Sequence, residues 1–241
     1  IFCNKNGISS NKNMEKRISL ILFALIFFAN NIYSQHEDFQ KKIRIPLWAE
    51  LDAYPGLAEA QDTSSGQFDY PINRLKTISP FLITGMTYGW NFTYTPYDKM
   101  RKVDEYFEVT PIAELSEKDG NIQYSKPWIQ DNKLYCWIEF DRTPHMQWTY
   151  RMWNSVNVKK IKGRGNGKIS DGFDGIQNAA KNALKEAIRE HYREIIKNKP
   201  KEISGKVIIR KTPKVGINSG QYVIELDFLL ESDRIVMYTM Y

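Results

Sequence analysis

The chain has 241 residues, a formal net charge of +6 and two cysteines, Cys3 and Cys136. Basic and acidic residues are interspersed along the sequence, which argues against a nucleic-acid-binding protein, because such proteins concentrate their basic residues on one surface. If the chain is cut after Ser34, only Cys136 remains, and the exported part cannot form an internal disulfide. That composition suits a bacterial envelope protein better than a small disulfide-stapled secreted domain.

Residues 14–34 have the layout of a secretory signal peptide. Two basic residues precede an apolar run from Ile18 to Ala29. The run is shorter than the roughly 20 apolar residues that cross a bilayer. We therefore expect cleavage after Ser34, export to the periplasm or the cell exterior, and no stable membrane span after cleavage. The alternative is that the segment stays uncleaved and tethers the protein to the inner membrane.

The rest of the chain divides into three parts. Residues 1–13 precede the first methionine and are interpreted as upstream sequence outside the native protein. Residues 35–70 are predicted to form an N-terminal arm and linker, because 60–70 is rich in Gln, Asp, Ser and Gly; one short strand is expected over 43–51. Residues 71–241 are predicted to form a single α+β domain.

The first elements of this domain are a strand and a short helix. Large and small residues alternate over 81–95, which predicts a strand. Thr95 can cap a helix and Pro96 suits its first position, so a helix is predicted over 96–107. Strands and extended segments are expected next, over residues 108–115, 122–124, 134–140 and 146–162.

The last third contains the clearest helix. A glycine-rich stretch, 163–167, is predicted to be a turn, with a phosphate- or anion-binding loop as the alternative. Apolar residues then recur at three- and four-residue steps over 171–198, which predicts a long amphipathic helix whose alanines allow close packing against a sheet. Strands follow over 206–211, 221–230 and 234–240. This order predicts an α+β fold with a mainly antiparallel sheet.

Residues that could carry chemistry are few. The three histidines have no metal-ligand spacing and one thiol remains, so we predict neither a metal site nor a cofactor. Glu139 and Asp141 share the polar face of the 134–140 strand with aromatic residues, as in a glycan-cleaving site. The same arrangement is also typical of the wet face of any antiparallel strand.

Aromatic residues are the remaining signal. Six tryptophans and fourteen tyrosines are present, and four of the tryptophans lie within 128–153. Core packing can explain many of these rings, but Tyr135, Trp137 and Trp153 are predicted to form a binding surface. The sequence therefore predicts an exported envelope protein that acts as a non-enzymatic binding or structural module for a protein partner or a glycan. The alternative is a secreted hydrolase that cleaves glycans through Glu139 and Asp141.

Overall fold

The structure, a computed structural model, describes residues 41–52, 66, 68–116, 119–155 and 158–238. The predicted signal peptide, the segment before it and most of the predicted linker lie outside the described residues. One compact unit runs from Lys42 to Tyr241, so it includes the first strand as well as residues 71–241. Within the described residues, no helix is both long enough and apolar enough to cross a membrane.

The fold is α+β, as predicted, and its strands pair in antiparallel fashion. The described elements are, in chain order, β1 (Lys42–Glu50), α2 (Asp69–Thr87), β2 (Trp90–Thr95), β3 (Tyr106–Pro111), β4 (Gln123–Gln130), β5 (Lys133–Asp141), α3 (Pro144–Trp153), β6 (Lys159–Lys168), a 3-10 turn (Ile169–Asp171), α4 (Gly172–Ile195), β7 (Glu202–Ile209), β8 (Lys214–Asn218) and β9 (Gln221–Val236).

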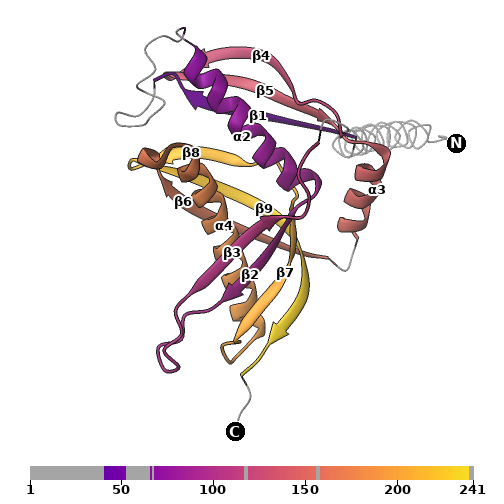
Figure 1. The fold of residues 1–241 in the computed structure, drawn as a ribbon, viewed down its shortest axis with the longest axis vertical. Coiled ribbons are helices and arrows are strands. Elements are labelled where there is room, and N and C mark those ends of the chain that lie inside the picture. The colour runs from indigo at the N-terminus through magenta and orange to yellow at the C-terminus, as the bar shows by residue number, and fades with distance from the viewer. Residues whose placement is uncertain (1–40, 53–65, 67, 117–118, 156–157, 239–241) are drawn as a thin grey trace, which may run out of the picture. The chain divides into compact units, whose positions relative to one another are not determined.

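The strands form two sheets (Figure 1). A three-stranded sheet has the order β1-β5-β4, and a six-stranded sheet has the order β3-β2-β7-β9-β6, with β8 also paired to β9. The long strand β9 is the centre of the larger sheet, because β6, β7 and β8 all pair with it. The smaller sheet is built from strands that are far apart in sequence, since β1 pairs with β5 along its whole length.

Helix α2 joins the two sheets. It packs against β1 and β5 of the smaller sheet and against β7 of the larger one. The buried Arg142, just after β5, donates a hydrogen bond to the Met86 carbonyl oxygen near the end of α2, at 2.7 Å. The Trp48 indole N–H on β1 donates to the Val215 carbonyl oxygen on β8, at 3.1 Å, which ties the two sheets together directly.

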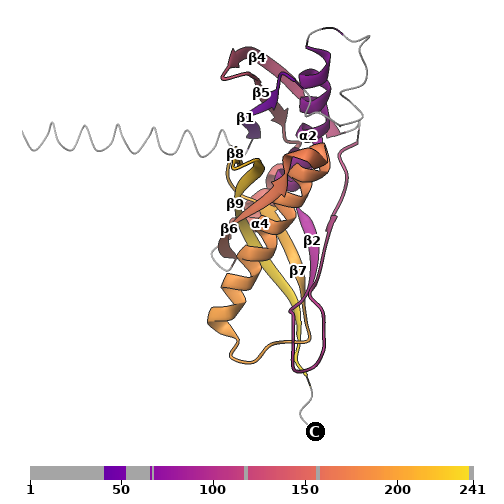
Figure 2. The ribbon, with the colours of Figure 1, turned by 90° about the vertical axis from the view of Figure 1, so that its left-hand side faces the viewer.

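The closest packing in the protein lies between α4 and β6, which run side by side in Figure 2. Three alternate glycines of β6, at positions 163, 165 and 167, face the alanine stripe of α4. A Cβ on Gly165 would lie 2.1 Å from the Ala179 carbonyl oxygen and 2.2 Å from the Ala183 nitrogen. The helix and the strand are therefore in backbone contact, which only glycine allows.

This contact corrects the prediction of a glycine turn over 163–167. The segment is instead the second half of β6, and it pairs residue by residue with β9. The predicted long helix is confirmed as α4, from Gly172 to Ile195. The turn prediction failed because three glycines so close together are far more often a turn than a strand, and the helix that requires them lies later in the chain.

The predicted strand over 81–95 is half wrong. Residues up to Thr87 belong to α2, whose last turn is followed by Gly89 at a φ of 83°. The strand begins only at Trp90, and from there its predicted alternation is confirmed, because Trp90, Phe92 and Tyr94 are buried. Phe81 on α2 stacks on Trp90, with ring centroids 5.1 Å apart, so the helix and the strand share one apolar cluster.

The predicted helix over 96–107 is wrong. Asp98 instead closes a local turn, in which its carboxylate accepts hydrogen bonds from the backbone N–H groups of Met100 and Arg101. Backbone hydrogen bonds in both directions join Asp98 to Val103, and β3 begins at Tyr106. An aspartate that bonds its own downstream backbone offers an alternative to the helix, and here the alternative prevails.

The extended run predicted over 146–162 is also wrong in its first half, which forms α3. The Thr143 side chain caps this helix by accepting a hydrogen bond from the Met146 N–H, and Pro144 occupies its first turn. Met146, Tyr150 and Trp153 form its buried stripe. Their spacing of four and three residues is helical, so the signal was present in the sequence.

Replacing Gly165 with alanine tests the backbone contact. Gly165→Ala should destabilise the protein by about 3 kcal/mol, because the added methyl overlaps the α4 backbone and forces β6 away from it. The midpoint of thermal unfolding should fall by roughly 10 °C. Gly216→Ala on β8 is the matched control, since no atom lies within 4 Å of its added Cβ. Equal midpoints for the two variants would contradict the close contact.

Candidate functional site

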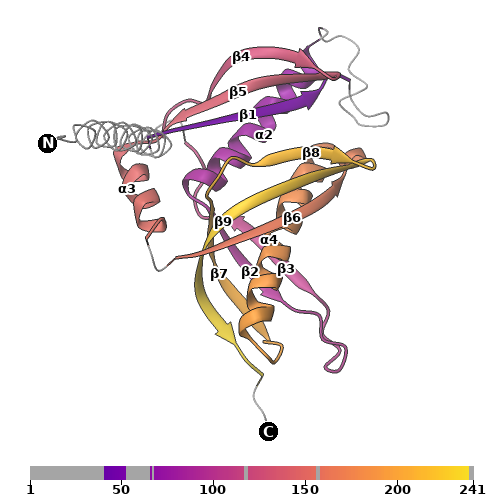
Figure 3. The same cartoon turned by 180° about the vertical axis from the view of Figure 1, so that it is seen from behind.

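The three-stranded sheet has two chemically different faces, because side chains alternate along each strand. Ile43, Ile45 and Leu47 of β1 and Ile138 and Phe140 of β5 are buried on the face that α2 covers. The opposite face carries aromatic and charged residues. This second face is seen from the side away from α2 in Figure 3.

Strand pairing brings aromatic residues from all three strands together on that second face. Trp48 of β1 lies opposite Tyr135 of β5, and Tyr135 lies opposite Trp128 of β4. Trp137 follows on β5, and its ring centroid is 6.3 Å from that of Trp128. We call these four residues, Trp48, Trp128, Tyr135 and Trp137, the aromatic face.

Each ring of the aromatic face already has a neighbour within stacking distance. Trp128 and Tyr135 stack on one another, with centroids 5.1 Å apart and planes inclined by 14°. The Arg44 guanidinium lies 4.5 Å above the Trp137 ring, and the Lys133 ammonium lies 4.1 Å from the centre of the Trp48 ring. These stacking and cation–π contacts hold the half-buried rings in defined positions.

The two predicted catalytic carboxylates border this face but differ in their surroundings. Glu139 pairs with the Lys42 ammonium at 2.6 Å and with Arg44 at 3.3 Å, and it accepts a hydrogen bond from the Ser125 hydroxyl at 3.0 Å. The hydrogen bonds from Lys42 and Ser125 lower the pKa of Glu139, so it is ionised at neutral pH. Asp141 lies at the end of β5 and is exposed. A general acid in glycoside cleavage needs a raised pKa, which Glu139 lacks.

Two of the three predicted binding residues lie together in the structure, and the third lies elsewhere. Tyr135 and Trp137 belong to the aromatic face, but Trp153 is buried on α3 and does not. The sequence reasoning missed Trp48 and Trp128. Trp48 could have been placed by its alternation with Ile45 and Leu47, whereas Trp128 follows an irregularity in β4 that interrupts the alternation.

The other reactive residues have structural surroundings. Cys136 is buried, burial raises the pKa of its thiol, and its Sγ lies 3.3 Å from the Ser125 carbonyl oxygen. His191 is partly buried beside Tyr192, and burial lowers its pKa. In the part of the chain that the structure describes, no group of three or more His, Cys, Asp or Glu residues could hold a metal ion.

A polar cleft of about 640 Å³ lies beside the first turns of α4. Its charges are mixed, and Lys185 pairs with Glu105 at 3.0 Å across it. The glycines of β6 do not form an anion-binding loop here, because their backbone belongs to the ladder with β9. The cleft is therefore a weaker candidate than the aromatic face.

Comparison with known proteins gives a family without an assigned role. An "Uncharacterized protein" of Treponema pallidum (strain Nichols) is 29% identical over 199 residues, which is 83% of either chain. No solved structure matches the chain. A family model for a domain of unknown function matches residues 30–238, and the chain belongs to that family.

Proposed function

We propose that the protein is an exported bacterial envelope protein that binds a protein partner, without catalysis, through its aromatic face. The observation that carries this proposal is the meeting of three tryptophans and a tyrosine from three strands, with Arg44 directly above one of them. Tryptophan, tyrosine and arginine are the residues that most often dominate the binding energy of protein interfaces.

The ring geometry favours a protein partner over a glycan. A sugar stacks on the flat face of an aromatic ring, and each ring of the aromatic face already has one of its two faces against a neighbouring ring or a cation, which leaves at most one face for stacking. The Trp48 indole N–H already donates to Val215, so a partner would contact the half-buried rings of Trp128, Tyr135 and Trp137 and the Arg44 guanidinium. Such groups suit the mixed polar and apolar contacts of a protein interface.

The surroundings of Glu139 weigh against the hydrolase alternative. Its lowered pKa keeps it ionised, and its oxygens already have partners in Lys42, Arg44 and Ser125. Glu139 thus serves to hold β1, β4 and β5 together beside the aromatic face. Export is supported by the layout of residues 14–34 and by the family match, which begins at residue 30, after the apolar run.

Substitution of one tryptophan by alanine tests the aromatic face. With a photo-crosslinking residue at the exposed position Gln123, we expect a discrete crosslinked partner in the native envelope. Trp137→Ala should weaken the complex by roughly 2 kcal/mol, about thirtyfold in affinity, because truncation of a central interface tryptophan has that size of effect. The measurement is the yield of this crosslink in the wild type and in Trp137→Ala.

Trp148→Ala is the matched control for that experiment. Trp148 is 59% exposed on α3 and is not part of the aromatic face. The crosslink should survive this substitution, and both variants should unfold at temperatures close to that of the wild type. An equal loss of the crosslink in both variants, or no loss in Trp137→Ala, would refute the proposal. Sedimentation of the wild type with insoluble envelope glycan would instead favour the glycan.

Glu139→Gln separates binding from hydrolysis. The change keeps the shape of the side chain and its ability to accept the Ser125 hydrogen bond, so the crosslink yield should stay within about twofold of wild type, as expected when a partly exposed ion pair is lost. A hydrolase would lose its turnover of envelope glycan in this variant. Wild-type release of soluble sugars that disappears in Glu139→Gln would establish the hydrolase.

The N-terminus of the native protein tests export. Edman degradation or mass spectrometry of protein isolated from the envelope fraction should give Gln35 as the first residue, because cleavage is expected after Ser34. A native chain that retains the apolar run from Ile18 to Ala29 would support the tethered alternative instead.

A further inference from the structure

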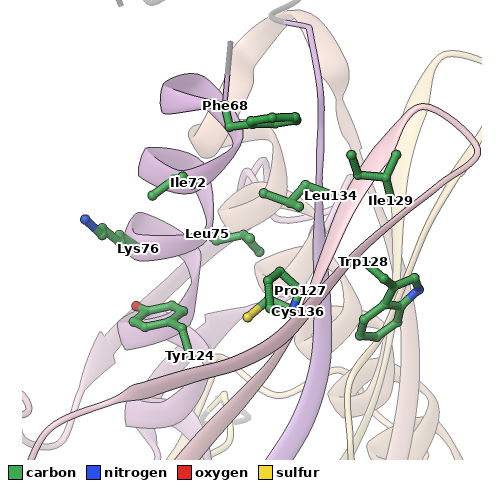
Figure 4. A pocket seen from close by; sticks show the side chains of 10 residues that line it. All are labelled: Phe68, Ile72, Leu75, Lys76, Tyr124, Pro127, Trp128, Ile129, Leu134 and Cys136. Atoms are coloured by element: carbon green, nitrogen blue, oxygen red, sulfur yellow. The ribbon is translucent and has the colours of Figure 1, made fainter. Parts of the chain in front are cut away.

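A second surface feature lies beside the edge of the three-stranded sheet, an apolar groove between α2 and β4. Figure 4 shows its lining, with Phe68, Ile72, Leu75 and Lys76 on the helix side and β4 on the other. Its volume is about 500 Å³, within the range of pockets that hold small molecules, roughly 300–1,000 Å³. We call it the apolar groove.

Large apolar side chains in this groove are open to solvent. Phe68 and Ile72 are each 38% exposed, and Ile129 on the opposite wall is 55% exposed. Leu134 and Cys136 of β5 form the floor. Clusters of exposed apolar residues are unfavourable in water, and where they line a concave site they mark binding sites for apolar ligands.

The polar groups of the groove are concentrated at one end. Lys76 and Tyr124 lie beside one another there, whereas Phe68 and Ile129 lie at the other end (Figure 4). Lys76 is exposed, and no hydrogen bond or ion pair occupies it among the described residues. Burial raises the pKa of Tyr124, so its hydroxyl keeps its proton at neutral pH, and the hydroxyl also lies within hydrogen-bonding reach of the Ser79 side chain.

The groove is elongated along the helix. Phe68 and Lys76 are eight residues apart, which is about 12 Å along an α-helix. A ligand that fills this space has an extended apolar body and one anionic end. The Cys136 thiol would not contact the anionic end of such a ligand, because its Sγ is directed at the Ser125 carbonyl oxygen.

We propose that the apolar groove binds a free fatty acid, with the alkyl chain between α2 and β4 and the carboxylate at Lys76 and Tyr124. The lining supplies the apolar contact along the chain, and Lys76, which has no hydrogen-bond or ion-pair partner among the described residues, supplies charge complementarity to the carboxylate. The groove lies on the α2 side of the sheet and the aromatic face lies on the other side, and Trp128, at the edge of the sheet, lines the groove and also belongs to the aromatic face.

A peptide strand added to the edge of β4 suits the groove less well. Lys126 has a φ of 49° and is followed by Pro127, and the pairing of β4 with β5 shifts between Ser125 and Trp128. A proline and a bulge interrupt the regular backbone ladder that strand addition needs. The observations thus favour a ligand held by apolar side chains rather than by backbone hydrogen bonds.

Calorimetric titration of the full chain tests the proposal, with dodecanoate and hexanoate below their micelle concentrations and dodecanol below its solubility limit. Dodecanoate should bind with a 1:1 stoichiometry, and hexanoate should bind far more weakly, because burial of each methylene adds to affinity. Lys76→Gln should weaken dodecanoate binding about fivefold and leave dodecanol within about twofold, as expected for one partly exposed ion pair. Lys160→Gln, an exposed lysine on β6, is its control and should change neither.

A charge placed in the groove gives the second test. Ile72→Glu should abolish the binding of both dodecanoate and dodecanol, whereas Ile217→Glu on β8, where the isoleucine is also 38% exposed, should leave both unchanged. Absence of dodecanoate binding by the wild type would overturn the proposal. Equal weakening by Ile72→Glu and Ile217→Glu would also overturn it, because the ligand would then adsorb to the protein without using the groove.

Discussion

The backbone contact between α4 and β6 is the constraint on which the arrangement of the other elements depends. The glycines of β6 let α4 lie against the strand, and this places Phe173, in the first turn of α4, against Phe81 of α2 at a centroid distance of 6.2 Å. Phe81 in turn stacks on Trp90 of β2. Helix α2 is thus positioned by the larger sheet and its helix, and the smaller sheet packs on α2.

The two proposed sites exist because the smaller sheet has only three strands and one covering helix. A three-stranded sheet packed on one side by a single helix leaves much of its other face uncovered, although Trp48 on that face contacts β8, and alternation puts the aromatic residues there. The helix lies over β1 and β5, so the edge strand β4 extends beyond it. The uncovered strip between α2 and β4 is the apolar groove, and Trp128 takes part in both sites because it lies at this edge.

Helix-start signals in the sequence indicate a helix correctly where no other local contact competes with it. They fail where a competing hydrogen bond forms instead. The dipeptide Thr-Pro occurs at residues 95–96, 110–111, 143–144 and 212–213, and of these only the one at 143–144 starts a helix. At 143–144 it starts α3, whose buried stripe can pack on the core. At 95–96 the same dipeptide starts no helix, because Asp98 bonds the backbone of its own turn. A cap therefore predicts a helix only when the following residues have a face to bury.

The sequence by itself determined the α+β class, the long helix α4 and the common face of Tyr135, Trp137 and Glu139, because each depends on periodicity within one segment. Only the tertiary structure decided that the glycine run is a strand, since the reason for those glycines is the backbone of a helix later in the chain. The tertiary structure likewise brought Trp48 and Trp128 to Tyr135. Trp48 and Tyr135 are 87 residues apart and meet only once β1 has paired with β5, a pairing that the local sequence does not indicate. Trp128 meets Tyr135 through the adjacent pairing of β4 with β5, and there the irregularity in β4 hides the alternation.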